Sequence, residues 1–221
     1  MSAKPEIVYG RRPVAEAKRG RRRVRRVWTS DDTDAAELTR LAGSPDHQGI
    51  VAEVDPYPYA DADLLLERPE ALVLALDQVQ DPHNLGAVAR SAEAAGLDGL
   101  VICGRRAASV TPAAAKASAG AVEHLPIARV TNLVQWLGKA KDSGAWIYGA
   151  EANAESPYTQ TDLTGKVVLV LGSEGKGLRR LVAERCDGLV SIPVRGRVAS
   201  LNVSAAAAAL LFEAVRQRGR I

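Results

Sequence analysis

Short, nearly unbroken apolar runs recur along the last two thirds of the chain. They lie at Ala71–Leu76, Leu100–Cys103, Trp146–Ala150, Val167–Leu171 and Leu189–Ile192. Stretches with helical character separate or follow them, at Leu85–Ala95, Ala113–Ala119, Asn132–Ala140, Leu178–Glu184 and Ser204–Arg218. Apolar strands that alternate with helices are typical of a parallel sheet with helices on both faces. The pattern therefore predicts an α/β domain over residues 71–221.

The first sixty residues follow a different pattern. It predicts a helix at Pro13–Lys18, a strand at Val24–Trp28, a helix around Asp31–Leu41 and a strand at Gly49–Val54. The segment 55–63 is acidic, Pro-rich and without periodicity, which is typical of a loop or linker. We expect a small basic α+β domain over residues 1–60 and a linker over residues 61–70.

A polar segment, residues 77–90, directly follows the first of the apolar runs. Proteins of the α/β class place their ligands at this carboxyl end of a strand. Asn84 is expected to be the N-cap of the following helix, and Arg90 lies six residues further on. Taken alone, the segment also fits a capped helix with a solvent-facing arginine.

A glycine-rich segment, residues 169–178, runs from a strand toward a helix. Its glycines indicate a backbone that approaches a ligand closely. The segment is not a Walker loop, because Gly175-Lys176 is not followed by Ser or Thr, and no further glycine completes a dinucleotide fingerprint. Glu174 is also unsuited to a phosphate. The segment predicts a ligand loop that is not a phosphate cradle.

A third segment, residues 192–204, precedes five alanines at the start of an amphipathic helix. Ser200, Asn202 and Ser204 alternate with other residues just before these alanines. Small alanines allow another backbone to come close. The alternative for this segment alone is a strand, a turn and a Ser-capped helix.

Composition and charge narrow the class of protein. Hydrophobic residues make up 47% and charged residues 25% of the chain, which excludes intrinsic disorder. No apolar run approaches the roughly 20 residues of a membrane helix. Cys103 and Cys186 are far apart, and His47, His83 and His124 are scattered, so neither a disulfide framework nor a metal site is expected. This cysteine usage fits a reducing cytosol, and we expect a cytoplasmic protein.

The charge is distributed unevenly along the chain. Residues 1–30 carry ten Lys or Arg and two Glu, although the whole chain has a net charge of only +3. A basic head on a mildly acidic body favours a polyanionic partner, most simply nucleic acid. A solvated arm without a partner is the alternative.

Together, the three segments resemble the three motifs of the SpoU family of RNA 2′-O-ribose methyltransferases, within the SPOUT superfamily. Its Asn-x-Gly motif with a following Arg matches Asn84, Gly86 and Arg90. Its Gly-x-Glu-Gly-x-Gly motif matches Gly172, Glu174, Gly175 and Gly177. Its Ile-Pro and Ser-Leu-Asn-Val-Ser motif matches Ile192, Pro193 and Ser200 to Ser204. The third motif departs from the family in Val194, Arg195 and Arg197, where Met and fewer charges are usual.

The resemblance implies a fold, a methyl donor and a set of site residues. It implies a trefoil knot in the C-terminal part of the sheet, a homodimer with the knot region at its interface, and S-adenosylmethionine as donor without a metal. The donor site would consist of Gly172, Ile192 and Leu201, and the catalytic residues would be Arg90, Asn84, Glu174, Ser200 and Asn202.

We interpret Arg90 as a positioning and charge-stabilising group, because a guanidinium stays protonated at neutral pH. An RNA phosphate is a candidate acceptor for the proton of the ribose 2′-hydroxyl. Asn84 and Asn202 are expected to orient Arg90 and the ribose, and Ser200 and Glu174 to shape the pocket.

The head resembles that of the branch that methylates a guanosine of 23S ribosomal RNA. Residues 8–14 and 47–52 look like the two ends of its small ribosomal-protein-like RNA-binding domain, with an abbreviated interior. RNA phosphates are expected to be contacted by Arg11, Arg12, Arg21, Arg22 and Arg23. Transfer RNA as the target, or a non-catalytic RNA-binding protein on the same fold, are the alternatives.

Overall fold

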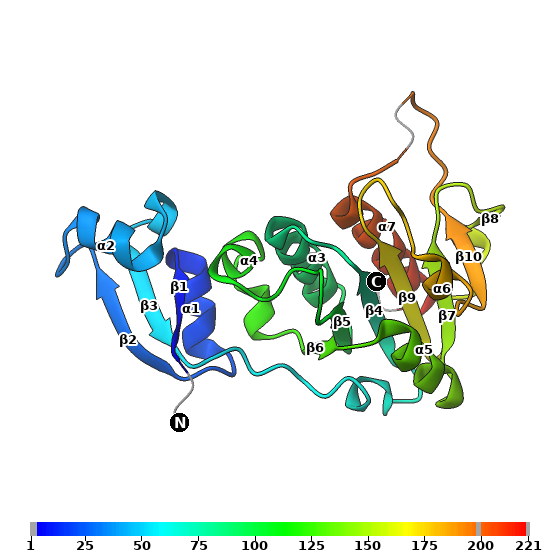
Figure 1. Ribbon diagram of the computed structural model, residues 1–221, viewed down its shortest axis with the longest axis horizontal. Coiled ribbons are helices and arrows are strands. Elements are labelled where there is room, and N and C mark those ends of the chain that lie inside the picture. The colour runs from blue at the N-terminus through cyan, green and yellow to red at the C-terminus, as the bar shows by residue number, and fades with distance from the viewer. Residues whose placement is uncertain (1–3, 198–199, 220–221) are drawn as a thin grey trace.

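Two sheets of unequal size lie at opposite ends of the long axis of the molecule, as Figure 1 shows for the computed structural model. The structure describes residues 4–197 and 200–219. The smaller sheet is antiparallel and has the strand order β1-β3-β2. The larger sheet has seven strands in the order β6-β5-β4-β9-β7-β10-β8, and each of their pairings is parallel. The predicted α/β fold with a parallel sheet is confirmed.

The smaller sheet and its helices form the head, residues 4–54. Its elements are β1 (Glu6–Tyr9), α1 (Arg11–Arg19), β2 (Val24–Thr29), α2 (Ala35–Ala42), the 3-10 turn η1 (Pro45–His47) and β3 (Ile50–Val54). The sequence pattern predicted all of these except β1 and η1. On one face of the sheet Val14 and Ala17 of α1 pack against Val8 and Val54, and on the other face Leu38 of α2 packs against Val51. These two apolar clusters are small.

The larger sheet is covered by helices on both faces. Its strands are β4 (Leu72–Asp77), β5 (Gly99–Cys103), β6 (Ile127–Val130), β7 (Trp146–Ala150), β8 (Ser156–Pro157), β9 (Val167–Gly172) and β10 (Gly188–Ser191). Its helices are η2 (Leu64–Leu66), α3 (Pro82–Ala94), α4 (Pro112–Ala117), η3 (Ala121–Glu123), α5 (Leu133–Asp142), η4 (Tyr158–Gln160), α6 (Arg180–Ala183) and α7 (Val203–Gln217). Helices α3, α4 and α7 contribute to the core on one face, and η2, α5 and α6 to the core on the other.

The central strand β4 explains why its sequence is apolar without alternation. Leu72, Leu74 and Leu76 belong to one core, and Val73 and Ala75 to the other. Successive side chains of a strand point to opposite faces, so a strand covered on both faces needs an apolar residue at each position. No helix within residues 4–197 and 200–219 is long and apolar enough to cross a membrane.

The stretch between the two sheets is packed against the larger one. Tyr57 is buried, and its hydroxyl donates a hydrogen bond of 2.8 Å to the carbonyl oxygen of Val122. Ala60 forms a parallel bridge with Ala128 of β6, and Leu65 and Leu66 are buried in a core of the larger sheet. The domain boundaries and the trefoil knot stay predictions.

Arg22 joins the head to the larger sheet through a buried ion pair. Its side chain is 2% exposed and that of Glu123 1%. Its Nε donates to Glu123 Oε2 at 2.9 Å, its Nη2 to the other oxygen of Glu123, and its Nη1 to Glu6 Oε2 at 2.9 Å. The expectation that Arg22 contacts RNA is therefore wrong, because its guanidinium is enclosed and all three of its nitrogens donate to carboxylates of the protein.

Arg21 takes part in the same docking contact. Its Nη2 donates a hydrogen bond of 2.7 Å to the carbonyl oxygen of Leu125. Elsewhere in the contact, Lys116 Nζ donates to the carbonyl oxygen of Asp46 at 2.9 Å, and His124 Nε2 lies 2.9 Å from Glu16 Oε2. Part of the basic run in the head thus binds the rest of the protein.

Candidate active site

The three sequence motifs meet at the carboxyl edge of the larger sheet. They follow β4, β9 and β10, and the loops after β9 and β10 rise from the same edge in Figure 1. Strands β4 and β9 are direct neighbours whose last paired residues are Asp77 and Gly172. Because parallel strands end at the same edge, motifs that are far apart in the sequence become neighbours.

Helix α3 begins earlier than the sequence indicated. Its N-cap is Asp81, whose side chain accepts a hydrogen bond of 2.9 Å from the backbone N–H of His83. Pro82 follows at the first helical position, where its fixed φ and missing N–H are favourable. The prediction that Asn84 caps this helix is wrong. Asn84 lies in the first turn, so its amide can bond outside the helix.

One residue from each motif forms a hydrogen-bonded trio. Asn84 Nδ2 donates to Glu174 Oε1 at 2.7 Å, and Asn202 Nδ2 donates to the same oxygen at 2.8 Å. Asn202 Nδ2 also lies 3.0 Å from Asn84 Oδ1. The two amides therefore hold one carboxylate between three loops that come from distant parts of the chain. We call these three residues the polar trio.

The orientation of Asn202 is fixed by the helix that follows it. Asn202 is the N-cap of α7, and its Oδ1 accepts hydrogen bonds from Ser204 N at 2.8 Å and from Ser204 Oγ at 2.6 Å. With the oxygen engaged in capping, the amide NH2 group points to Glu174 and Asn84. Asparagine is a preferred N-cap residue, so it replaces the serine cap considered from the sequence.

The glycine loop, residues 172–178, folds back on itself. Gly175 and Gly177 have φ values of 74° and 63°, a region that strongly favours glycine. Gly177 N donates to the carbonyl oxygen of Ser173 at 3.0 Å. A Cβ on Gly172 would lie 2.1 Å from the carbonyl carbon of Gly177, so any side chain there would displace the loop.

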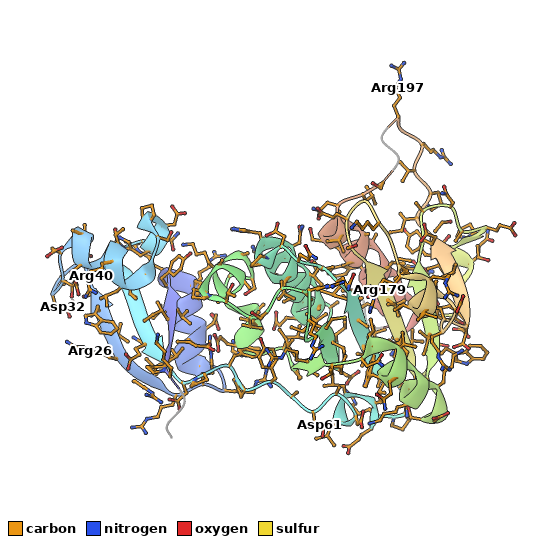
Figure 2. The ribbon with its side chains drawn as sticks, viewed as in Figure 1. Arg26, Asp32, Arg40, Asp61, Arg179 and Arg197 are labelled. Atoms are coloured by element: carbon orange, nitrogen blue, oxygen red, sulfur yellow. The ribbon has the colours of Figure 1, made fainter. Side chains whose placement is uncertain are left out.

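An ion pair between the buried Asp77 carboxylate and the half-exposed Arg179, which the sequence motifs did not reveal, closes the base of the glycine loop. Asp77 is 1% exposed, and its carboxylate accepts hydrogen bonds from Arg179 N at 2.9 Å and Arg179 Nε at 2.7 Å. Figure 2 shows Arg179 beside the ends of the central strands. An acidic residue directly after an apolar strand was the available clue to this contact.

A cavity of about 670 Å³ lies under the glycine loop. It is lined by residues after β7, β9 and β10 and by the start of α7, and it contains all three predicted donor-site residues, Gly172, Ile192 and Leu201. Glu174, Ser200 and Asn202 also line it, together with Glu151, which the sequence did not single out. Its volume is typical of a small-molecule site.

The lining of this cavity suits S-adenosylmethionine. Leu171, Val190, Ile192, Leu201 and Ala206 provide apolar surface for a purine ring, and the glycine loop provides accessible backbone groups. The carboxylates of Glu151 and Glu174 suit a positively charged sulfonium better than a phosphate. Among the residues that the structure describes, no group of three or more His, Cys, Asp or Glu could hold a metal ion.

Arg90 is the predicted catalytic residue that lies apart from the others. It is exposed on α3, about 9 Å further along the helix axis than Asn84. It does not line the cavity, and within the described ranges it makes no ion pair or hydrogen bond through its side chain. Within a single chain, the structure therefore brings together Asn84, Glu174, Ser200 and Asn202 but not Arg90.

Gly86 of the first motif has a packing role. A Cβ at this position would lie 2.5 Å from the carbonyl oxygen of Ala114 and 2.6 Å from the Cβ of Ala117. Glycine therefore lets α3 pack closely against α4, which fixes the helix that carries Asn84 and Arg90.

Of the arginines of the head that were expected to bind RNA, three are exposed without an ion pair in the described parts of the chain. They are Arg11, Arg12 and Arg23. Nearby, Arg25 pairs with Asp55 at 2.6 Å, and the guanidinium of Arg26 lies 4.9 Å from the centre of the Trp28 ring.

This chain resembles known RNA methyltransferases in sequence and in structure. The model of the SpoU rRNA Methylase family matches residues 71–212. YacO of Bacillus subtilis (strain 168), assigned to the TrmH family of tRNA/rRNA methyltransferases, is 38% identical over 247 residues, which span 100% of this chain and 99% of YacO. The SpoU methyltransferase AviRb from Streptomyces viridochromogenes, solved in complex with the cofactor AdoMet, is 28% identical with a TM-score of 0.84 over 97% of this chain and 90% of AviRb. A solved RNA 2′-O ribose methyltransferase is 26% identical, with a TM-score of 0.82 over 96% of this chain and 88% of that one.

Proposed function

Because the chain belongs to the SpoU rRNA methylase family and is an RNA 2′-O-ribose methyltransferase that uses S-adenosylmethionine, we propose that its substrate is a guanosine of 23S ribosomal RNA. The observation that carries the chemistry is the polar trio, which joins all three motifs at the wall of one cavity. The description of the family and the basic head support a ribosomal target. Transfer RNA is the alternative, because YacO is assigned to a family of tRNA and rRNA enzymes.

We propose that Gly172, Ile192 and Leu201 bind the methyl donor. Bound S-adenosylmethionine supplies an electrophilic methyl group on a sulfonium. Gly172 has no side chain and lies against the carbonyl of Gly177. The backbone of the glycine loop therefore forms one side of the site. The Asp77–Arg179 pair holds the end of this loop, so the site is preformed in the free protein.

The polar trio is placed to position the acceptor ribose. Asn84 and Asn202 hold the Glu174 carboxylate, so the three loops keep one geometry while the RNA enters. In the reaction the ribose 2′-oxygen forms a bond to the methyl carbon, the carbon–sulfur bond breaks, and the hydroxyl proton leaves to an acceptor such as an RNA phosphate. A guanidinium near the 2′-oxygen stabilises the charge that develops there, and we assign this role to Arg90.

The position of Arg90 supports a homodimer in which it completes the site of the second subunit. It is exposed and outside the cavity of its own chain. Helix α7 also exposes Ala205 and the large apolar side chain of Phe212, which is 44% exposed, on residues seven positions apart and hence on one face. Covering this face in a dimer would remove it from water.

Two measurements test this proposal. Incubation with bulk bacterial RNA and methyl-labelled donor should label 23S ribosomal RNA, and mapping of 2′-O-methyl groups should find a guanosine. Label that is confined to transfer RNA would overturn the ribosomal target. The Arg90→Ala variant should transfer methyl at least about a hundredfold more slowly, the loss expected for a preorganised charged donor.

The dimer is tested by mixing two inactive variants. Arg90→Ala and Asn202→Ala subunits that exchange should regain activity, because one site of the mixed dimer then has both residues. If the mixture stays inactive although the subunits exchange, Arg90 acts within its own chain or does not act in the reaction.

A further inference from the structure

Three cationic residues lie on the two loops that help to line the donor cavity. Lys176 of the glycine loop lines the cavity, and so does Val194, which precedes Arg195 in the loop between β10 and α7. Arg197 follows near the tip of that loop, and Figure 2 shows its side chain extended away from the body of the protein. All three cationic residues are exposed. We call Lys176, Arg195 and Arg197 the cationic rim.

Several other surface arginines are paired with carboxylates, but within the described residues those of the rim are not. Arg180 of α6 pairs with Glu184 at 2.5 Å, and Arg216 of α7 pairs with Glu213 at 2.7 Å. In the parts of the chain that the structure describes, no carboxylate pairs with a member of the rim, and none of its side chains makes a hydrogen bond. Glu174, the carboxylate nearest in sequence to Lys176, is held by the amides of the polar trio. The charges of the rim are therefore free to attract an anion.

We propose that the cationic rim binds the RNA phosphates that flank the target ribose. This inference rests on the proposed function. In RNA the carbon that bears the 2′-hydroxyl is bonded to the carbon that carries the 3′-phosphate ester. A ribose that presents its 2′-oxygen to the cavity therefore brings backbone phosphates to the surrounding surface, where the rim lies.

The types of residue in the rim fit this role. A guanidinium binds phosphate with two parallel hydrogen bonds, and a lysine binds it as a point charge. Contacts to phosphates fix the register of an RNA without reading its bases. Lys176 and the two arginines stand on different loops, which come together only at the cavity, so they can hold the strand on either side of the reacting nucleotide.

The test compares two variants of the full chain that each lose two positive charges. Arg195→Ser with Arg197→Ser removes rim charges, and Arg180→Ser with Arg216→Ser removes charges that are already paired. Binding of a fluorescein-labelled single-stranded RNA of mixed sequence is measured across a salt series, and binding of S-adenosylmethionine by calorimetry. The slope of log affinity against log salt should fall by about 1.4 in the rim variant, which is 0.7 for each phosphate that is no longer neutralised. The control variant should keep the slope of the parent, and all three proteins should bind the donor equally.

Equal slopes for the rim variant and the control would overturn the proposal. Weakened donor binding in the rim variant would also overturn it, since Arg195 and Arg197 would then act on the donor and not on the RNA. The salt series reports on the rim even if the parent methylates no RNA, an outcome that would contradict the proposed function alone. A loss of self-association in the rim variant, at an unchanged slope, would overturn it too and assign the loop to an interface with a second copy.

Discussion

The buried ion pair between Arg22 and Glu123 provides a sharp test of how the head is held. We compare Glu123→Gln with Asp55→Asn, which changes the exposed pair of Asp55 with Arg25. Both substitutions keep the size of the side chain and remove one charge. The side chains of the first pair are 2% and 1% exposed, whereas those of the second are 34% and 39% exposed. The two variants therefore differ mainly in burial.

The burial of each pair sets the expected loss of stability. In Glu123→Gln the guanidinium of Arg22 stays enclosed and keeps only the partly exposed Glu6 as a charged partner. Removing one member of a buried pair costs about 3–5 kcal/mol, because the other charge is left without compensation. In Asp55→Asn water solvates Arg25, so the loss should stay below about 1 kcal/mol. Against a typical total stability of about 5–15 kcal/mol, the first loss is large.

Urea unfolding at pH 7 measures both losses. We expect a lower midpoint for Glu123→Gln at an unchanged m-value, and a midpoint close to that of the parent for Asp55→Asn. A second variant, Arg22→Met with Glu123→Leu, should recover much of the loss, since it removes both buried charges. If Glu123→Gln and Asp55→Asn lose the same small amount, the buried pair does not hold the head and the reasoning fails.

Three further predictions concern the cores and the site. Gly86→Ala should destabilise the protein by about 1–3 kcal/mol, because the added methyl group overpacks the contact with α4. Gly138→Ala, in the open middle of α5, should stabilise the protein by up to about 1 kcal/mol. Urea unfolding in which both variants gain stability would refute the tight α3–α4 contact. Asp77→Asn should raise the Kd of the donor at least about tenfold, because Arg179 loses a charge-assisted hydrogen bond. Calorimetry that shows binding equal to that of the parent would mean that the Asp77–Arg179 pair does not support the donor site. Burial raises the pKa of the Cys186 thiol to about 12. At pH 8 this thiol therefore forms about a thousandfold less thiolate than an unperturbed cysteine, and it should react slowly with iodoacetamide until the protein is unfolded. Rapid alkylation of the native protein would contradict this.

The arrangement of the site was accessible from the sequence because parallel strands impose it. Each motif follows an apolar run, and the carboxyl ends of such strands share one edge. This explains why Asn84, Glu174 and Asn202, which only the family resemblance had grouped, lie in one place. The strands β6 and β8 were not predicted, because one contains the charged Arg129 and the other has only two residues. Short edge strands carry too few apolar positions to show a pattern.

The helix start at Asp81 was missed for a local reason. Asp and Asn are equally good N-caps, and both occur within four residues of each other at this site. Pro82 was the deciding residue, because it is favoured at the first helical position and so places the cap at Asp81.

A run of arginines does not reveal which member is buried. Arg22 lies between exposed Arg21 and Arg23, and its carboxylate partner Glu123 is 101 residues away in the sequence. No local pattern could indicate that contact, since it depends on how the two sheets are placed. The charge of this arginine run correctly predicted an anionic partner, but the partner of Arg22 is a carboxylate of the protein itself.

The buried ion pair also explains why the head has one orientation. Apolar contacts are non-directional, so they cannot by themselves select an angle of docking. Any orientation that separates Arg22 from Glu123 while keeping the interface closed leaves two buried charges unpaired, at a cost of several kcal/mol for each ion. The hydrogen bonds of Arg21 to Leu125 and of Lys116 to Asp46 add direction at two other points of the same interface. The polar pairs thus restrict the contact to one geometry, which fixes the exposed cations of the head relative to the cavity.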